Sequence, residues 1–332
     1  MMKARQYDRR LLTRGIQPHI YAFAESNTIT TAPLHDMGIT LSQDEYDTAV
    51  KQVLRLLDEL RDAKEYGSIL TVTPCDWDLL RRFAVPRTED EGGQQLLGIH
   101  GEQFDAPLLQ RLINIGEALS QQYDVVVTNP PYMGASGMNA RLSQYIKDHF
   151  PDTKADLFAC FIERGNQMAV KHGYNCMVTM QSWMFLSSFE KMREKILRTK
   201  SITNLMHMEN MVMGIAFGTA VTIFRNDHIT GYKGTYNQIK LQDIENGEPK
   251  TFPVPENRFA QTSTDNFSKI PGSPVAYWVN ASILTAYEQG NLIGDSADVK
   301  IGMGTGKNEI FVREWWEVFY TKIDFSLKTI ND

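Results

Sequence analysis

Four consecutive residues have the chemical types needed to hold a planar amino group. Asn129, Pro130, Pro131 and Tyr132 directly follow a run of apolar residues. Asn129 offers an amide oxygen and Pro130 a free backbone carbonyl, so two hydrogen-bond acceptors stand side by side. The prolines restrict the backbone and hold these acceptors in place before a ligand arrives, while the flat ring of Tyr132 could stack on the group that carries the amine. A plain proline turn is the alternative explanation of the same four residues.

The run that leads into these residues predicts the element that must position them. Residues 123–129, YDVVVTN, lack polar alternation, which is typical of a strand covered on both faces in a parallel α/β sheet. Ligands of such sheets bind at the carboxyl ends of the strands. We expect further strands at 17–24, 174–181, 202–209 and 216–226, and helices at 43–66, 106–122, 155–171 and 184–199. This alternation predicts an α/β, doubly wound, Rossmann-like domain.

The helix expected at 43–66 has a clear amphipathic pattern. Ser42 could cap its start together with Glu45, three residues later, and Gly67 could end it. Its apolar face consists of Ala49, Val50, Val53, Leu54, Leu57 and Leu60. The helix at 106–122 has a similar set, made of Leu108, Leu109, Leu112, Ile113 and Ile115. Both patterns predict helices that bury one face.

Composition limits the class of protein and its compartment. The chain has 332 residues, 42% of them hydrophobic, and a formal net charge of -6, so it is not a basic nucleic-acid coat, although a local basic face would suffice to bind DNA. Its three cysteines have no metal-type spacing, which favours a reduced, cytoplasmic compartment. The first residues, MMKARQYDRRLL, lack the apolar core of a signal peptide, and no stretch of about 18 apolar residues occurs, so we expect no membrane span. The residues after 228 become rich in Gly, Pro, Asn, Thr and Ser, which predicts a catalytic domain at 1–228 and a second domain at 229–332.

The Asn-Pro-Pro-Tyr sequence after an apolar strand resembles the catalytic motif of S-adenosylmethionine-dependent, amino-directed methyltransferases. The resemblance is closest to the DNA adenine-N6 methyltransferases, which take the adenine out of double-stranded DNA into a pocket. It implies that Asn129 and the Pro130 carbonyl accept from the adenine amino group, that Tyr132 stacks on the base and that Pro131 is a rigid support. The same motif can present a protein glutamine amide or a guanine amino group of ribosomal RNA, and both alternatives stay open.

Two further segments agree with this family. Residues 156–163 resemble the helix that follows the catalytic motif, and the resemblance implies that Asp156 and Phe161 contact the cofactor. Residues 216–224 resemble a later strand of the family, and they imply that Phe217 stacks on the other side of the base. An ordinary place in the hydrophobic core is the alternative for both phenylalanines.

A wider pattern resembles one subfamily, the BREX-type (phage growth limitation) adenine methyltransferases of bacterial phage defence. This resemblance rests on residues 68–70 and on residues 302–317, GMGTGKNEIFVREWWE. The glycines lack the spacing of a P-loop and Asn308 replaces its Ser or Thr, so binding of a nucleoside triphosphate is rejected. The resemblance instead implies the start of a target-recognition domain, with Lys307 and Arg313 as phosphate contacts.

One expected feature of the family is missing from the sequence. Residues 1–122 contain no glycine-rich turn after a strand that would bind S-adenosylmethionine, since the candidate glycines at 92, 93, 98 and 101 stand in the wrong context. We therefore expect a chain that lacks the first strands of the sheet, is inactive or nearly so alone, and needs the missing half or other phage-defence proteins as partners. An open apolar sheet edge and poor solubility would follow. A non-catalytic DNA- or partner-binding protein is the alternative.

Overall fold

The computed structural model forms two compact units, Met1–Asn280 and Ala281–Asp332. It describes residues 18–29, 34, 37–85, 106–212, 214–252, 254, 259–291, 293–297 and 317–322. The second unit contains three short helices among these residues, α10 (Ala281–Gln289), α11 (Ile293–Ser296) and η10 (Tyr320–Lys322). None of the helices in the described ranges is long and apolar enough to cross a bilayer.

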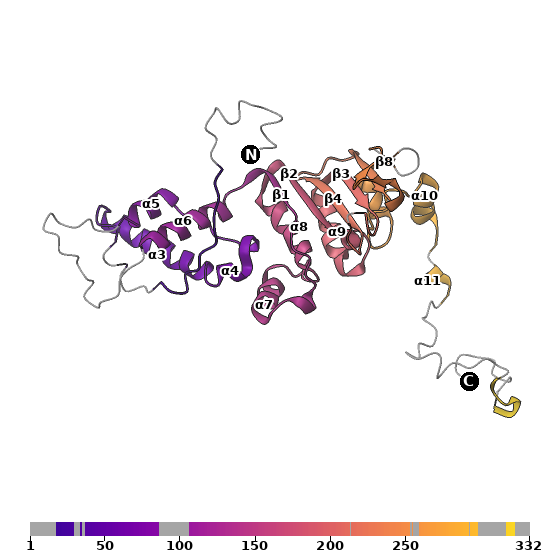
Figure 1. Ribbon diagram of the computed structural model, residues 1–332, viewed down its shortest axis with the longest axis horizontal. Coiled ribbons are helices and arrows are strands. Elements are labelled where there is room, and N and C mark those ends of the chain that lie inside the picture. Colours follow the sequence, from indigo (N-terminus) through magenta and orange to yellow (C-terminus); the bar gives the residue numbers. More distant parts are fainter. Residues whose placement is uncertain are drawn as a thin grey trace. The chain divides into compact units, whose positions relative to one another are not determined.

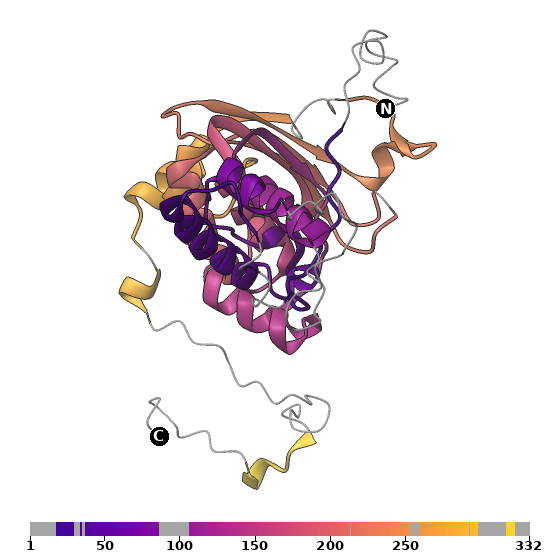
Figure 2. The same ribbon diagram turned by 90° about the vertical axis from the view of Figure 1, so that its left-hand side faces the viewer.

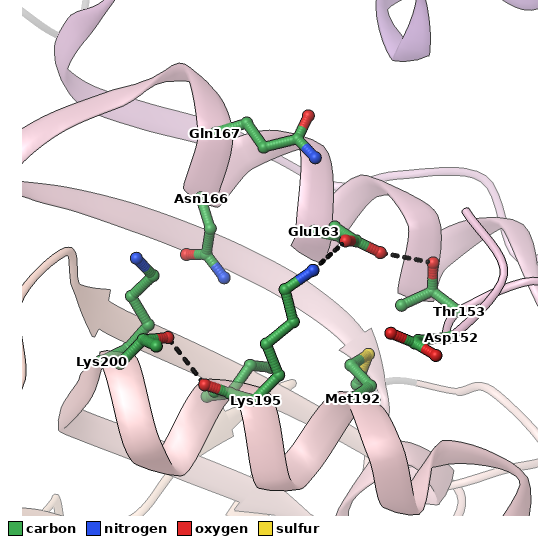
Figure 3. A pocket seen from close by; sticks show the side chains of 10 residues that line it. Asp152, Thr153, Glu163, Asn166, Gln167, Met192, Lys195 and Lys200 are labelled. Atoms are coloured by element: carbon green, nitrogen blue, oxygen red, sulfur yellow. Dashed lines mark hydrogen bonds and ion pairs between the residues drawn. The ribbon is translucent and has the colours of Figure 1, made fainter. Parts of the chain in front are cut away.

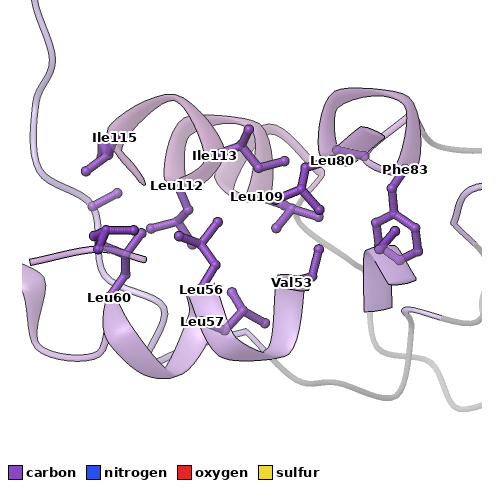
Figure 4. Close-up of a cluster of buried hydrophobic side chains, with 14 of the residues drawn as sticks. Val53, Leu56, Leu57, Leu60, Leu80, Phe83, Leu109, Leu112, Ile113 and Ile115 are labelled. Atoms are coloured by element: carbon purple, nitrogen blue, oxygen red, sulfur yellow. The ribbon is translucent and has the colours of Figure 1, made fainter. Parts of the chain in front are cut away.

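The first part of the larger unit is a cluster of helices. Helix α3 (Gln43–Glu59) packs with α5 (Trp77–Phe83) and α6 (Ala106–Ser120) around buried leucines and isoleucines (Figure 4). The predicted capping box is confirmed, because the Ser42 side chain accepts from the backbone of Glu45 and the Glu45 carboxylate accepts from the backbone of Ser42. Each buried leucine stabilises the folded chain by about 2 kcal/mol, so this cluster of helices has a hydrophobic core of its own.

Two sequence predictions in this region were wrong. The helix expected at 43–66 ends at Glu59 and restarts as α4 (Ala63–Tyr66), because Asp62 adopts a left-handed conformation with φ 54°. The Asn27 side chain holds this break, since its amide donates to the Asp62 carboxylate (2.7 Å) and its oxygen accepts from the Asp62 backbone (2.9 Å). Residues 18–24 form no strand, because they find no strand partner and instead rest Ala24 on the helical core.

A six-stranded sheet follows, in the order β1-β2-β4-β3-β5-β8 (Figure 1). Its strands are β1 (Tyr123–Thr128), β2 (Ala169–Met180), β3 (Ser201–Met208), β4 (Thr219–Arg225), β5 (Lys233–Ile239) and β8 (Phe259–Ser263). The pairs β1–β2 and β3–β5 are parallel, whereas β4 and β8 run antiparallel to their neighbours. The α/β class is confirmed, and the sheet is mixed rather than parallel throughout. A separate hairpin joins β6 (Ile244–Glu245) to β7 (Glu248–Pro249).

Two helices pack on one face of this twisted sheet, whose curvature Figure 2 shows. These are α8 (Leu157–Met168) and α9 (Glu190–Thr199), and α7 (Ala140–His149) precedes them. Their apolar residues share a core with alternate residues of the central strands, such as Met177, Ala220 and Phe224. The strand residues between these, such as Val178 and Ile223, point to the opposite face and are only half-buried.

The sheet extends past the boundary predicted at residue 228. Strands β5 and β8 both lie beyond that residue and pair within the same sheet. The larger compact unit accordingly runs to Asn280. The change in composition after residue 228 marks longer loops between the last strands, because Gly and Pro accumulate wherever the chain turns.

Strand β1 lies at one edge of the sheet among the described strands. Its apolar run predicted burial on both faces, yet Val125 is 52% exposed and Val127 is 72% exposed. That prediction was wrong for the described structure, because α8 packs on one face of β1, whereas Val125 and Val127 point to the other face. An exposed apolar edge of this kind is a template for pairing with another strand.

Lysine at position 127 is expected to reduce self-association of the chain. A charge on an edge strand opposes edge-to-edge pairing. Because the side chain is exposed, Val127→Lys should change the free energy of unfolding by no more than about 0.5 kcal/mol. Sedimentation velocity over a range of concentrations measures the effect. Unchanged association of the variant would show that the β1 edge is not the contact.

Candidate active site

One edge of the sheet collects the segments that carry polar and aromatic side chains. Strands β1, β2 and β3 all end at this edge, because β4 is antiparallel to both β2 and β3. The residues 129–132 follow β1, and Gln181 follows β2. His207 lies near the end of β3, and Phe217 lies just before β4 begins at the same edge. Loops at the carboxyl ends of strands are where α/β sheets bind ligands.

The four residues after β1 form a tip with one exposed acceptor. Asn129 and Pro131 are exposed, Pro130 is buried and Tyr132 is half-buried. The Tyr132 hydroxyl lies 3.1 Å from both the Asn129 side-chain oxygen and the backbone oxygen of Val178, so its single proton is shared between them. An amide oxygen has two lone pairs, and the second one of Asn129 stays available for a ligand. Burial raises the pKa of Tyr132, so the hydroxyl is a donor at neutral pH.

Asp156 fixes the tip to the start of α8. Its Oδ1 accepts from the backbone N–H of Met133 at 3.1 Å and from that of Phe158 at 3.3 Å, which makes it the N-cap of the helix. The backbone N–H of Leu157 also donates to the Met133 oxygen at 3.0 Å. Burial raises the pKa of Asp156, while these backbone donors oppose the rise. The contacts give Asp156 a role in positioning the tip, and its contact with a cofactor stays a prediction.

The structure brings the predicted stacking residues together. The rings of Tyr132 and Phe217 meet edge to face, with centroids 5.7 Å apart and an interplanar angle of 68°. A base stacked between two parallel rings would separate them by about 7 Å, twice the usual stacking distance. Phe217 must therefore tilt to admit a base on its side of Tyr132. Phe161 is half-buried on α8 between two apolar clusters, and its contact with a cofactor also stays a prediction.

Sequence reasoning missed a buried polar group behind the tip. The His207 ring is 7% exposed and contacts the Tyr277 hydroxyl at 3.0 Å through Nδ1 and the Gln181 side-chain oxygen through Nε2. Burial lowers the pKa of His207 to about 4, although nearby Glu209 opposes the shift. The ring is therefore neutral at physiological pH. A lone histidine in the apolar segment ITNLMHME was the available signal.

His207 should make the protein less stable in mild acid. Its unfolded form binds a proton below about pH 6.5, but the folded form does so only near pH 4, so stability falls as pH drops through this window. From pH 7 to pH 5 the loss from this group is about 2 kcal/mol. Urea denaturation of the native chain and of His207→Gln at both pH values measures it. His149→Gln, an exposed site on α7, is the control, and an equal pH dependence in the His207 variant would contradict the assignment.

Other predicted site residues have a different status. Lys307 and Arg313 lie outside the described residues, as do the glycines at 92, 93, 98 and 101. Their predicted phosphate contacts are therefore untested. Within the described ranges, no group of three or more His, Cys, Asp or Glu residues is placed to hold a metal ion.

A cavity of about 260 Å³ lies away from the tip, between α8 and α9 (Figure 3). Two of its charged groups pair with each other, since Lys195 lies 2.6 Å from Glu163, and the Thr153 hydroxyl donates to Glu163 at 3.0 Å. Lys200 also lines it, and burial lowers the pKa of this lysine. The Lys195–Glu163 pair connects the two helices. The carboxyl edge of the sheet therefore remains the candidate active site.

Comparison with known proteins shows what this chain is similar to. Residues 86–212 match the model of the Eco57I restriction-modification methylase family. The chain is 33% identical to the adenine-specific methyltransferase BrxX of Escherichia coli O9:H4 (strain HS), over 98% of this chain and 28% of that protein. It is 30% identical to the adenine-specific methyltransferase PglX of Lacticaseibacillus casei (strain Zhang), over 98% of this chain and 27% of that protein. The chain spans just over a quarter of the length of these relatives.

Solved structures give weaker likenesses. A structure of a type I restriction-modification system aligns with 50% of this chain and 38% of that one, with 16% identity and a TM-score of 0.38. A type I methyltransferase subunit from Streptococcus thermophilus aligns with 55% of this chain and 40% of its own, with 15% identity and a TM-score of 0.29. TM-scores this low assign no function. The sequence matches carry more weight: residues 86–212 match the Eco57I restriction-modification methylase family, and the chain is similar over 98% of its length to the adenine-specific methyltransferases BrxX and PglX.

Proposed function

We propose that this chain supplies the target-base face of a DNA adenine-N6 methyltransferase of phage defence. One observation carries the proposal. The exposed amide of Asn129 stands at the carboxyl edge of the sheet beside the rings of Tyr132 and Phe217. An acceptor next to flat rings fits an aromatic base with an exocyclic amino group, and adenine taken out of double-stranded DNA is such a base.

Each residue of the tip has a distinct task in this proposal. The Asn129 oxygen and the Pro130 carbonyl accept hydrogen bonds from the two N–H groups of the adenine amino group. These bonds reduce the conjugation of the nitrogen lone pair with the ring. The buried ring of Pro130 and the rigid Pro131 keep both acceptors fixed. Tyr132 stacks on the base, and its hydroxyl holds the Asn129 side chain at 3.1 Å. The amine attacks before it loses a proton, so no general base is needed for the transfer step.

S-adenosylmethionine, when bound, would supply an electrophilic methyl group. The described residues fit only part of what this cofactor needs. Asp156, the N-cap of α8 that bonds to the tip, and Phe161 on the same helix are candidate contacts. A glycine-rich turn after a strand is not found among the residues that the structure describes. We therefore propose that the rest of the cofactor site lies outside them and that the chain alone is inactive or nearly so.

The names of the relatives support the proposed reaction. BrxX and PglX are named adenine-specific methyltransferases, and this chain resembles just over a quarter of each. From them we infer double-stranded DNA as the substrate. Other phage-defence proteins, or further segments of the same polypeptide, are the partners expected for the missing part of the enzyme.

The test is carried out in the cell that encodes the chain, where all partners are present. N6-methyladenine is mapped across the genome before and after deletion of the coding sequence. We expect methylation at one recurrent DNA sequence to disappear and to return on complementation. If no adenine methylation depended on the gene, the proposed function would be wrong. Loss of methylation from a protein glutamine or from ribosomal RNA instead would identify another amino substrate.

A further inference from the structure

A pair of exposed aromatic rings lies next to the candidate active site and has no role in the reaction proposed above. Trp278 is 52% exposed and Phe185 is 36% exposed, with ring centroids 5.7 Å apart. The Trp278 ring also stacks on His207, at 6.5 Å and an interplanar angle of 28°. Large aromatic side chains bury most of their surface in ordinary cores, so two adjacent exposed rings indicate a binding surface.

A buried arginine holds the two segments that carry these rings. Arg193 on α9 is 1% exposed, and its guanidinium donates to backbone carbonyl oxygens on both sides. On the Phe185 side it reaches Trp183 at 2.9 Å and Leu186 at 2.6 Å. On the Trp278 side it reaches Gly272 at 2.6 Å and Ser273 at 3.2 Å. The exposed rings are therefore mounted on a fixed support.

The same surface is continuous with the proposed adenine site. Gln181 contacts His207 through its side chain, and its backbone N–H donates to the oxygen of Gly218 at 3.0 Å. A Cβ atom at position 218 would collide with the end of the Gln181 side chain, which would then have to leave its present position. Phe217 precedes that glycine and contacts Tyr132. A continuous chain of contacts thus runs from the tip to Trp278.

We propose that Trp278 and Phe185 form a second stacking surface, which takes an unpaired nucleobase next to the adenine held at the tip. The proposal rests on the proposed function, because it takes DNA as the ligand. Removing one base from a duplex leaves its former pairing partner unpaired and its neighbours without a stacking partner on one side. Exposed aromatic rings replace that stacking without reading sequence, since every base has a π-face. The surface would therefore hold the opened strand while leaving the choice of site to other residues.

The test measures binding of a fluorescein-labelled single-stranded oligonucleotide and of the matching duplex to the full chain. Stacking on one aromatic ring is worth about tenfold in affinity. Trp278→Ala should therefore weaken single-strand binding about tenfold, and Trp278→Phe should retain much of it. Tyr232→Ala is the matched control, because Tyr232 is 37% exposed and lies at the amino end of β5, at the opposite edge. Duplex binding should change less than single-strand binding.

Each other outcome has a definite meaning. Equal single-strand affinity of Trp278→Ala and the native chain would overturn the proposal. So would loss of self-association in the variant at unchanged DNA affinity, because the rings would then be a contact between copies. The variant Ser136→Ala, at an exposed site after the tip, should bind the single strand normally. Absence of adenine methylation in the cell, with single-strand binding still dependent on Trp278, would remove the proposed reaction without removing this surface.

Discussion

Replacing Asn129 with alanine is expected to lower the rate of adenine methylation about 100-fold or more, because removing one preorganised hydrogen-bond partner at a reacting group has an effect of that size. The side chain is exposed, so the substitution should leave folding intact. DNA affinity should change little, since the phosphates supply most of the binding energy. The measurement is transfer of a labelled methyl group by the protein purified with its partners from the cell that encodes it.

A conservative variant separates chemistry from packing at this position. Asn129→Asp keeps an oxygen acceptor at the tip, so it should retain more activity than alanine. Ser136→Ala, at an exposed position after the tip, is the control for a substitution in the same loop that leaves Asn129 in place. If Asn129→Ala kept more than about a tenth of the native methylation rate, the loss would be too small for a direct partner of the reacting amine. Asn129 would then not have this role.

Arg193→Met is expected to lower the free energy of unfolding by about 3 kcal/mol, because it leaves several carbonyl oxygens without their charged donor. The guanidinium donates to carbonyl oxygens of two segments. One segment lies 79 and 80 residues after Arg193 in the sequence, and the other lies 7 and 10 residues before it. Burial lowers the pKa of Arg193, which shows that its charge is costly in this environment.

The matched control lies on the same helix. Arg198 is exposed on α9, so Arg198→Met should change stability by no more than about 0.5 kcal/mol. Urea denaturation followed by tryptophan fluorescence compares the two variants with the native chain. A small effect of Arg193→Met would mean that water can satisfy the carbonyl oxygens and that the two segments are held by other contacts.

The elements that position the tip could be predicted because their signals are local. The apolar run before Asn129, the Ser42 capping box and the helical face around Val53 all depend on neighbouring residues. The break at Asp62 could not be predicted, since it is held by Asn27, 35 residues away. The site behind the tip was missed for the same reason: His207 gains its meaning from Gln181 and Tyr277 only after folding.

Strand direction was the other failure of prediction, and its cause is also long-range. Parallel and antiparallel neighbours use the same β-branched residues, so β4 and β2 look alike in sequence. Exposure of Val125 and Val127 depends on what packs on their face of the sheet, which the strand's own sequence does not specify. By contrast, Tyr132 and Phe217 were matched through the family resemblance, and the structure places their rings in contact.

The position of β4 between β2 and β3 has a consequence for how the chain folds during synthesis. Strands β2 and β3 emerge first but do not pair with each other, because each pairs with β4. The antiparallel β3–β4 pair is the most local one, and local pairs form fastest. Its connecting loop carries Phe217. The centre of the sheet can therefore close only after Arg225 has left the ribosome, and the aromatic edge of the candidate active site is assembled in the same step that joins β2 to the sheet.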